Sequence, residues 1–136
     1  MRKLLKSAVF IVFFAGTLSG VVGCNKTRPL LIPSFEAQSS NSSVISKAVR
    51  VSLLKRGWSI LSDKPGRIEA TYRKGGEAAA NIAVTYKGKQ VKIEHLSSTN
   101  LLYGQDQAGT PVIHRTYNNW MIYLERDIQT EIARNS

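Results

Sequence analysis

Four short segments in which apolar and polar residues alternate follow one another between residues 58 and 97. The segments are WSILSD at 58–63, RIEATYRK at 67–74, AAANIAVTYK at 78–87 and QVKIEHLS at 90–97. In the second segment, Ile68, Ala70 and Tyr72 alternate with charged or hydroxyl residues, which is typical of a strand with one buried face. Parallel neighbours would need crossovers of about a dozen residues, and only short turns separate these segments. The sequence therefore predicts an antiparallel meander of four strands.

A helix is expected before the meander. Residues 43–56 carry apolar side chains at helical spacing, and Ser42 or Ser43 can cap the first turn. Gly57 suits the end of this helix, because the residue there often adopts a left-handed conformation. The earlier segment PLLIPSF at 29–35 is too apolar for a free linker, and we expect it to lie against the domain as an extended edge.

A second, longer helix is expected after the meander. Thr110 and Pro111 suit its cap and its first position, and the helical pattern continues to about Arg134. Its apolar stripe consists of Tyr117, Trp120, Met121, Leu124, Ile128 and Ile132. The order α-β-β-β-β-α predicts a two-layer α+β domain over residues 44–136, in which an N-terminal and a longer C-terminal helix flank the four-stranded meander.

The N-terminus has the pattern of a signal peptide. Basic residues precede an apolar run at 8–15 that is too short to span a bilayer. Residues 21–24, VVGC, resemble the lipobox of bacterial lipoproteins, which are cleaved before an acylated cysteine. The resemblance implies a lipoprotein signal peptide at 1–23, followed by a lipidated Cys24 and a tether over 24–43. The alternative is an ordinary secretory peptide that leaves a free thiol behind.

Asn25 follows that cysteine and bears on the choice of membrane. In lipoproteins of the enteric type an aspartate at this position retains the protein at the inner membrane. The resemblance therefore implies a lipid anchor in the outer membrane, with the domain facing the periplasm.

The net charge indicates which kind of molecule the domain could bind. Cleavage would leave 136 − 23 = 113 residues with a net charge of 16 − 9 = +7. This charge suits an envelope protein with an acidic surface or another anionic envelope component, although it can also serve only solubility. A signal peptide makes nucleic acid a poor candidate.

The sequence contains few residues in patterns that are typical of a catalytic or metal site. The two histidines, His95 and His114, are too few for a typical zinc site without carboxylates. Glu94 is expected on the opposite face of the strand from His95, so the two side chains cannot chelate together. No G-x-S-x-G, P-loop or dinucleotide-binding pattern occurs. We therefore predict no catalytic residue, no metal and no cofactor.

Polar and aromatic residues around the start of the second helix form the one candidate site. They are Asn100, Tyr103, His114, Tyr117, Asn118 and Trp120. Aromatic and amide groups near a helix N-terminus can make a pocket for a polar or anionic group. The alternative is that the aromatic residues belong to the core, while His114 and Asn118 hold the preceding loop by hydrogen bonds to its backbone.

Five segments together resemble a family of small, functionally uncharacterised lipoproteins of Gram-negative bacteria. They are RGW at 56–58, PGRIEATY at 65–72, IAVTY at 82–86, STNLLY at 98–103 and IHRTYNNWMIYL at 113–124. They include the G-W, S-x-N-L-x-Y and I-H-x-x-Y-N-x-W patterns of that family in the same order. The resemblance implies an envelope location and a shared fold, and it carries no activity.

These features predict a lipid-anchored envelope lipoprotein with a non-enzymatic binding or protein-interaction module. The alternative is a binder of a small molecule or of an envelope glycan that uses the loop 100–104 and the start of the C-terminal helix. An enzyme would need His114 in a concave site with a carboxylate in reach.

Overall fold

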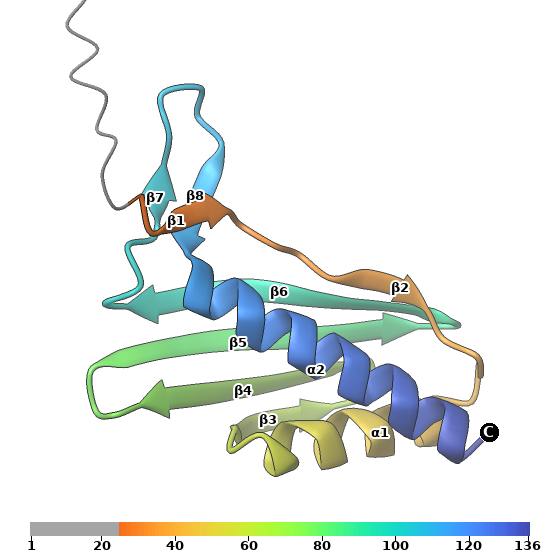
Figure 1. The fold of residues 1–136 in the computed structure, drawn as a ribbon. Coiled ribbons are helices and arrows are strands. Elements are labelled where there is room, and N and C mark those ends of the chain that lie inside the picture. Colours follow the sequence, from red (N-terminus) through yellow and green to blue (C-terminus); the bar gives the residue numbers. More distant parts are fainter. Residues whose placement is uncertain (1–24) are drawn as a thin grey trace, which may run out of the picture.

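A computed structural model describes residues 25–136, so the expected signal peptide and Cys24 lie outside the described residues. The domain has two layers, a β-sheet and a pair of helices that cover one of its faces (Figure 1). The helices are α1, Ser42–Lys55, and α2, Arg115–Arg134, and they pack against each other. The predicted α+β class with two helices and antiparallel strands is confirmed.

The main sheet has five strands in the order β2-β6-β5-β4-β3, and all neighbours are antiparallel. The strands are β2, Ser34–Glu36; β3, Ser59–Lys64; β4, Arg67–Lys74; β5, Ala78–Lys87; and β6, Gln90–Thr99. β3 to β6 form in the four alternating segments. The expected sheet of four strands is nevertheless incomplete, because β2 pairs with β6 and places Phe35 opposite Val91.

The residues expected to form a tether, 24–43, contribute two strands, β2 and β1, Thr27–Pro29. β1 pairs with β8, Pro111–His114, which also pairs with β7, Gly104–Gln105, in a second sheet of three strands (Figure 1). The buried ring of Phe35 anchors this part of the chain in the core. The apolar segment thus lies on the domain as an extended edge, as the sequence predicts.

Helix α2 begins later than the sequence predicts. Pro111 opens strand β8 rather than the helix, and α2 starts at Arg115 with His114 as its N-cap. The β-branched residues Val112 and Ile113 favour a strand, and pairing with both β1 and β7 stabilises it. A Thr-Pro pair fits the start of a strand as well as the start of a helix, and here the tertiary pairing decides between them.

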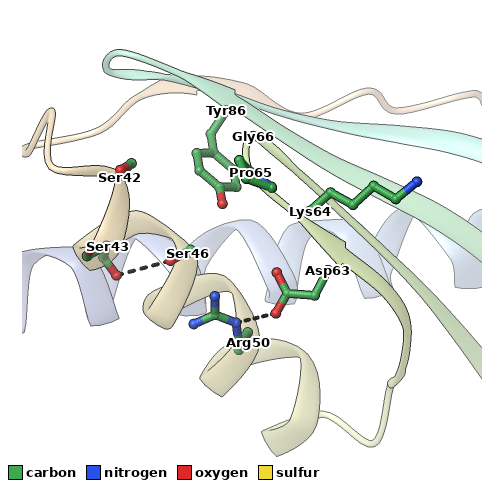
Figure 2. Close-up of a pocket in the computed structure, with 9 residues that line it drawn as sticks. All are labelled: Ser42, Ser43, Ser46, Arg50, Asp63, Lys64, Pro65, Gly66 and Tyr86. Atoms are coloured by element: carbon green, nitrogen blue, oxygen red, sulfur yellow. Dashed lines mark hydrogen bonds and ion pairs between the residues drawn. The ribbon is translucent and has the colours of Figure 1, made fainter.

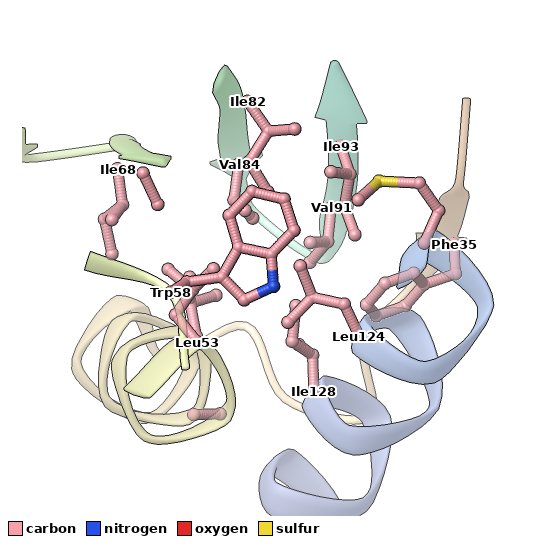
Figure 3. Close-up of a cluster of buried hydrophobic side chains, with 14 of the residues drawn as sticks. Phe35, Leu53, Trp58, Ile68, Ile82, Val84, Val91, Ile93, Leu124 and Ile128 are labelled. Atoms are coloured by element: carbon pink, nitrogen blue, oxygen red, sulfur yellow. The ribbon is translucent and has the colours of Figure 1, made fainter. Parts of the chain in front are cut away.

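The core lies between the helices and the five-stranded sheet (Figure 3). Leu53 of α1 and Leu124 and Ile128 of α2 meet Ile82 and Ile93 of the sheet, and all five side chains are fully buried. The apolar stripes that predicted the two helices therefore face the sheet.

The other face of the sheet is polar, and neither helix within residues 25–136 covers it. Four of its charged side chains pair within the face: Arg67 contacts Glu69 at 3.0 Å and Lys92 contacts Glu94 at 3.2 Å. These exposed pairs add little to stability.

Candidate functional site

Six ring-bearing side chains from the loops, the sheet and α2 contact one another in a continuous row. This aromatic row consists of Trp58, Tyr72, His95, Tyr103, Tyr117 and Trp120. The Tyr103 and His95 ring centroids are 4.3 Å apart, and the edge contact between His95 and Tyr117 spans 5.3 Å. Tyr117 continues the row to Trp120 at 6.4 Å. Each contact of this kind stabilises the fold by about 0.5–1.5 kcal/mol beyond the burial of area.

The structure divides the six site residues that the sequence predicts into two groups. Three belong to the aromatic row, namely Tyr103, Tyr117 and Trp120. The other three, Asn100, His114 and Asn118, hydrogen-bond to the backbone. Asn100 Nδ2, for example, donates to the carbonyl oxygen of Glu77 at 3.1 Å. The six residues therefore do not line one pocket.

His114 caps α2. Its Nδ1 atom accepts a hydrogen bond from the backbone N–H of Thr116 at 3.0 Å, which satisfies one of the free donors at the helix start. Within residues 25–136, no hydrogen bond or ion pair joins His114 to a carboxylate. In the same part of the chain no group of three or more His, Cys, Asp or Glu residues could hold a metal ion.

Asn118 fastens the N-terminal segment to α2. Its Oδ1 atom accepts from the backbone N–H of Leu31 at 3.0 Å, and its Nδ2 atom donates to the carbonyl oxygen of Pro29 at 2.9 Å. One amide side chain thus pairs with the C=O of the last residue of β1 and with an N–H two residues later. The side chain holds a segment about ninety residues away in sequence rather than a ligand.

The inner part of the aromatic row is shielded from water. Tyr117 is fully buried, and its hydroxyl has no hydrogen-bond partner among the described residues. Burial therefore raises the pKa of this phenol well above its ordinary value. The pKa of His95 is lowered by burial, and its Nε2 atom lies 2.9 Å from Ser98 Oγ.

A pocket of about 200 Å³ opens at the far end of the aromatic row. This aromatic pocket is lined by Arg56, Trp58, Tyr72, Trp120 and Tyr123. The Tyr72 ring is tilted toward Trp58 at 5.3 Å and meets Trp120 edge-on at 4.8 Å. Trp58 and Trp120 are also edge to face, with centroids 6.3 Å apart. Mutual contact among these three rings keeps their positions fixed.

The one charged wall of the aromatic pocket is held in place from α2. Arg56 donates from Nε and Nη2 to the two carboxylate oxygens of Asp127, at 2.6 and 3.1 Å. The guanidinium carbon also lies 5.1 Å from the centre of the Tyr123 ring. The hydrogen bond from Arg56 holds the pKa of Asp127 below its ordinary value, so this carboxylate stays ionised. A bidentate pair fixes the guanidinium plane and leaves other N–H groups free to donate.

Gly57 brings Arg56 and Trp58 to the same pocket. Its φ of 85° ends α1 in the left-handed conformation and turns the chain sharply between these two neighbours. A Cβ atom here would also lie 3.4 Å from the Tyr72 ring. The helix-ending glycine that the sequence indicates thus lies between two residues that line the pocket.

Of the five residues that line the aromatic pocket, the sequence pattern predicts only Trp120 as a site residue and misses Arg56, Trp58, Tyr72 and Tyr123. Tyr72 is expected on the buried face of its strand, and Tyr123 lies outside the apolar stripe of the helix. The spacing of three residues between Trp120 and Tyr123 places both on neighbouring parts of one helix surface, which was the available signal. Arg56, at the end of α1, and Tyr72, in β4, reach the pocket only because elements that are distant in sequence pack together.

A second, more polar hollow of about 350 Å³ lies between α1 and the β3–β4 turn (Figure 2). Arg50 and Asp63, which line it, pair at 2.5 Å and so neutralise each other. At the nearby start of α1, the Asn41 side chain accepts from the N–H groups of Ser43 and Val44. These contacts occupy only some of the donors there, and the hollow, in which Tyr86 is the one aromatic ring, lacks the cluster of rings that lines the aromatic pocket.

Comparison with known proteins gives no assignment: no family model and no curated protein matches the sequence. In the described part of the chain, neither helix is long and apolar enough to cross a membrane.

Proposed function

We propose that this chain is a lipid-anchored lipoprotein of the bacterial envelope and that its domain is a non-enzymatic binding module. The signal-peptide pattern and the VVGC lipobox support acylation of Cys24. Asn25 supports an anchor in the outer membrane, from which the domain faces the periplasm. The capping role of His114 speaks against a catalytic base at the start of α2.

The aromatic pocket is the binding site that we propose, and its ligand is one sugar ring of an envelope glycan. The observation that carries this proposal is the meeting of Trp58, Tyr72 and Trp120 beside the oriented guanidinium of Arg56. The apolar C–H face of a sugar ring packs well on indole and phenol faces. The free N–H groups of Arg56 suit the hydroxyl oxygens at the edge of the same ring.

The size of the pocket agrees with a single ring. Its volume of about 200 Å³ is below the roughly 300–1,000 Å³ that is typical of pockets for drug-sized ligands. An ion pair of zero net charge beside the pocket also fits a neutral ring better than a phosphate or a quaternary ammonium. A terminal sugar or one exposed unit of a longer glycan would satisfy these limits.

Tryptophan fluorescence provides a direct test, because Trp58 and Trp120 are the only tryptophans in the chain and both line the pocket. We expect a saturable change with neutral monosaccharides or soluble peptidoglycan fragments. Tyr123→Ala should weaken binding about tenfold or more, equivalent to about 1.4 kcal/mol. Ile122→Ala is the matched control, since Ile122 is adjacent on α2, comparably exposed and absent from the pocket lining. Equal weakening in both variants, or no saturable response to any of these sugars, would refute the sugar site.

The anchor has a separate test. Mass spectrometry of the N-terminal peptide from membranes should show cleavage before Cys24 and an acylated cysteine. Cys24→Ser should remain uncleaved and should lack the acyl mass. Recovery of a mature wild-type protein without acyl groups would refute the lipid anchor and would leave the sugar site to be judged by fluorescence.

A further inference from the structure

The fold begins almost at the proposed anchor. Strand β1 starts at Thr27, and the carbonyl oxygen of Lys26 already accepts a hydrogen bond from the N–H of Arg115 at 2.9 Å. Only Asn25 and Lys26 separate Cys24 from β1. Since a chain spans at most about 3.6 Å per residue, Thr27 lies within about 11 Å of Cys24. A lipid on that cysteine would therefore hold the β1 end of the domain at the bilayer surface.

This end of the domain is fixed to the rest of the fold. β1 pairs with β8 along its length, with Thr27 opposite His114. The two hydrogen bonds of the Asn118 side chain fasten Pro29, at the end of the strand, and Leu31, just beyond it, to α2. A domain held this way cannot pivot freely on a tether, so the anchor also determines which surface faces the membrane.

The loop beside this strand pair exposes two large apolar side chains. The carbonyl oxygen of Leu101 accepts from the N–H of His114 at 2.7 Å, and His114 lies opposite Thr27. The next residues, Leu102 and Tyr103, are 59% and 53% exposed. An apolar surface of this kind thus lies next to the point where the chain enters the fold.

Two residues of this loop have a strained, left-handed backbone conformation. Leu102 has a φ of 55° and Asn100 a φ of 56°, and they are the only non-glycine residues with positive φ within residues 25–136. Glycine would adopt this conformation without steric cost, whereas a leucine side chain does so unfavourably. Strained residues of this type are concentrated at functional sites. The strained loop is therefore a candidate contact surface.

The charges around the loop suit an anionic surface. Lys26, Arg28 and Arg115 are exposed, and none of them belongs to an ion pair within the described chain. Asp106, in the turn between β7 and β8, uses its Oδ1 atom to accept from the N–H groups of Ala108 and Thr110. Exposed cations beside an apolar loop are typical of surfaces that rest on anionic lipid headgroups.

We propose that β1 and the loop 100–103 form a membrane-contact surface that lies on a leaflet containing anionic phospholipids. Leu102 and Tyr103 enter the interface between headgroups and acyl chains, and Lys26, Arg28 and Arg115 lie over the headgroups. This inference rests on the lipid anchor of the proposed function and adds an orientation to it. The domain is held directly against the bilayer instead of extending from it on a tether.

The test uses the acylated full chain in vesicles of phosphatidylcholine with phosphatidylglycerol. Because the only natural cysteine would carry the lipid, a new cysteine takes a fluorescent label uniquely. We compare Leu102→Cys with Leu61→Cys, a matched control on the bulged edge strand β3 that is similarly exposed at 62%. A quencher attached to the lipid headgroups should quench the label at position 102 several-fold more than the label at position 61.

Three outcomes separate the proposals. Strong quenching at position 102 alone supports the orientation, and its decrease in Lys26→Gln/Arg115→Gln supports the role of the cations. Equal quenching at positions 102 and 61 in a protein with a confirmed acyl mass overturns the orientation and leaves the anchor intact. A missing acyl mass on Cys24 overturns both.

Discussion

Replacing Tyr117 by phenylalanine should make the protein more stable. The Tyr117 ring is fully buried between His95 and Trp120, and its hydroxyl has no hydrogen-bond partner among the described residues. Tyr117→Phe removes only that hydroxyl and keeps the ring in both aromatic contacts. The change therefore isolates the free energy of burying one unpaired polar group.

The magnitude follows from the cost of such burial. A buried polar group without a partner costs about 1–3 kcal/mol, and loss of the oxygen leaves a small void that offsets part of this gain. We expect the free energy of unfolding to rise by about 1 kcal/mol. For a domain of this size the Tm should rise by about 4 °C.

Urea unfolding followed by tryptophan fluorescence measures this difference. Tyr103→Phe is the matched control, because Tyr103 also contacts His95 but is exposed to water, and its stability should change by less than about 0.5 kcal/mol. A Tyr117→Phe protein that is less stable than wild type by about 1 kcal/mol would refute the reasoning. That result would mean that the hydroxyl has a partner in solution, such as a bound water molecule.

Three further predictions concern His114, Asn118 and His95. His114→Ala should lower the free energy of unfolding by about 1 kcal/mol through loss of the helix cap, whereas His114→Ser should retain most of it in thermal melts. Asn118→Ala should speed amide hydrogen exchange at Leu31, and unchanged exchange there would contradict its role as a fastening. Burial lowers the pKa of His95 from its ordinary 6.5, so the folded state favours the neutral ring. Burying the neutral His95 ring therefore costs no stability above about pH 6.5. As the pH falls from there to the folded-state pKa, the unfolded chain binds a proton on His95 that the folded protein does not, and the free energy of unfolding decreases. His95→Phe should show a smaller decrease in Tm over that range.

The sequence identified those elements whose signals are local. The alternation around Ile68 and the stripe that includes Leu124 are periodic patterns, and both predict a regular element without knowledge of its partner. Strands β1, β2 and β8 are only three or four residues long, and partners distant in sequence determine them. No periodic pattern can be read from so few residues.

The candidate site was predicted only in part for a similar reason. Tyr117 and Trp120 share a helix face, so their proximity follows from spacing alone. Tyr72 and Arg56 reach Trp120 only because β4 and α1 pack beside α2. As the alternative expects, the side chains of His114 and Asn118 bond to the backbone, but neither holds the preceding loop. His114 caps its own helix, and Asn118 holds the end of β1 and the residues after it.

The pairing of β1 with β8 has a consequence for the order in which the chain folds. Thr27 and His114 are 114 − 27 = 87 residues apart, so the pairing of β1 with β8 closes a loop over most of the described chain. Closing so long a loop is entropically costly, so we expect this pairing to form late in folding. Truncation before β8 would therefore release both ends of the domain at once, because β1 would lose its partner strand and the first helix would lose α2.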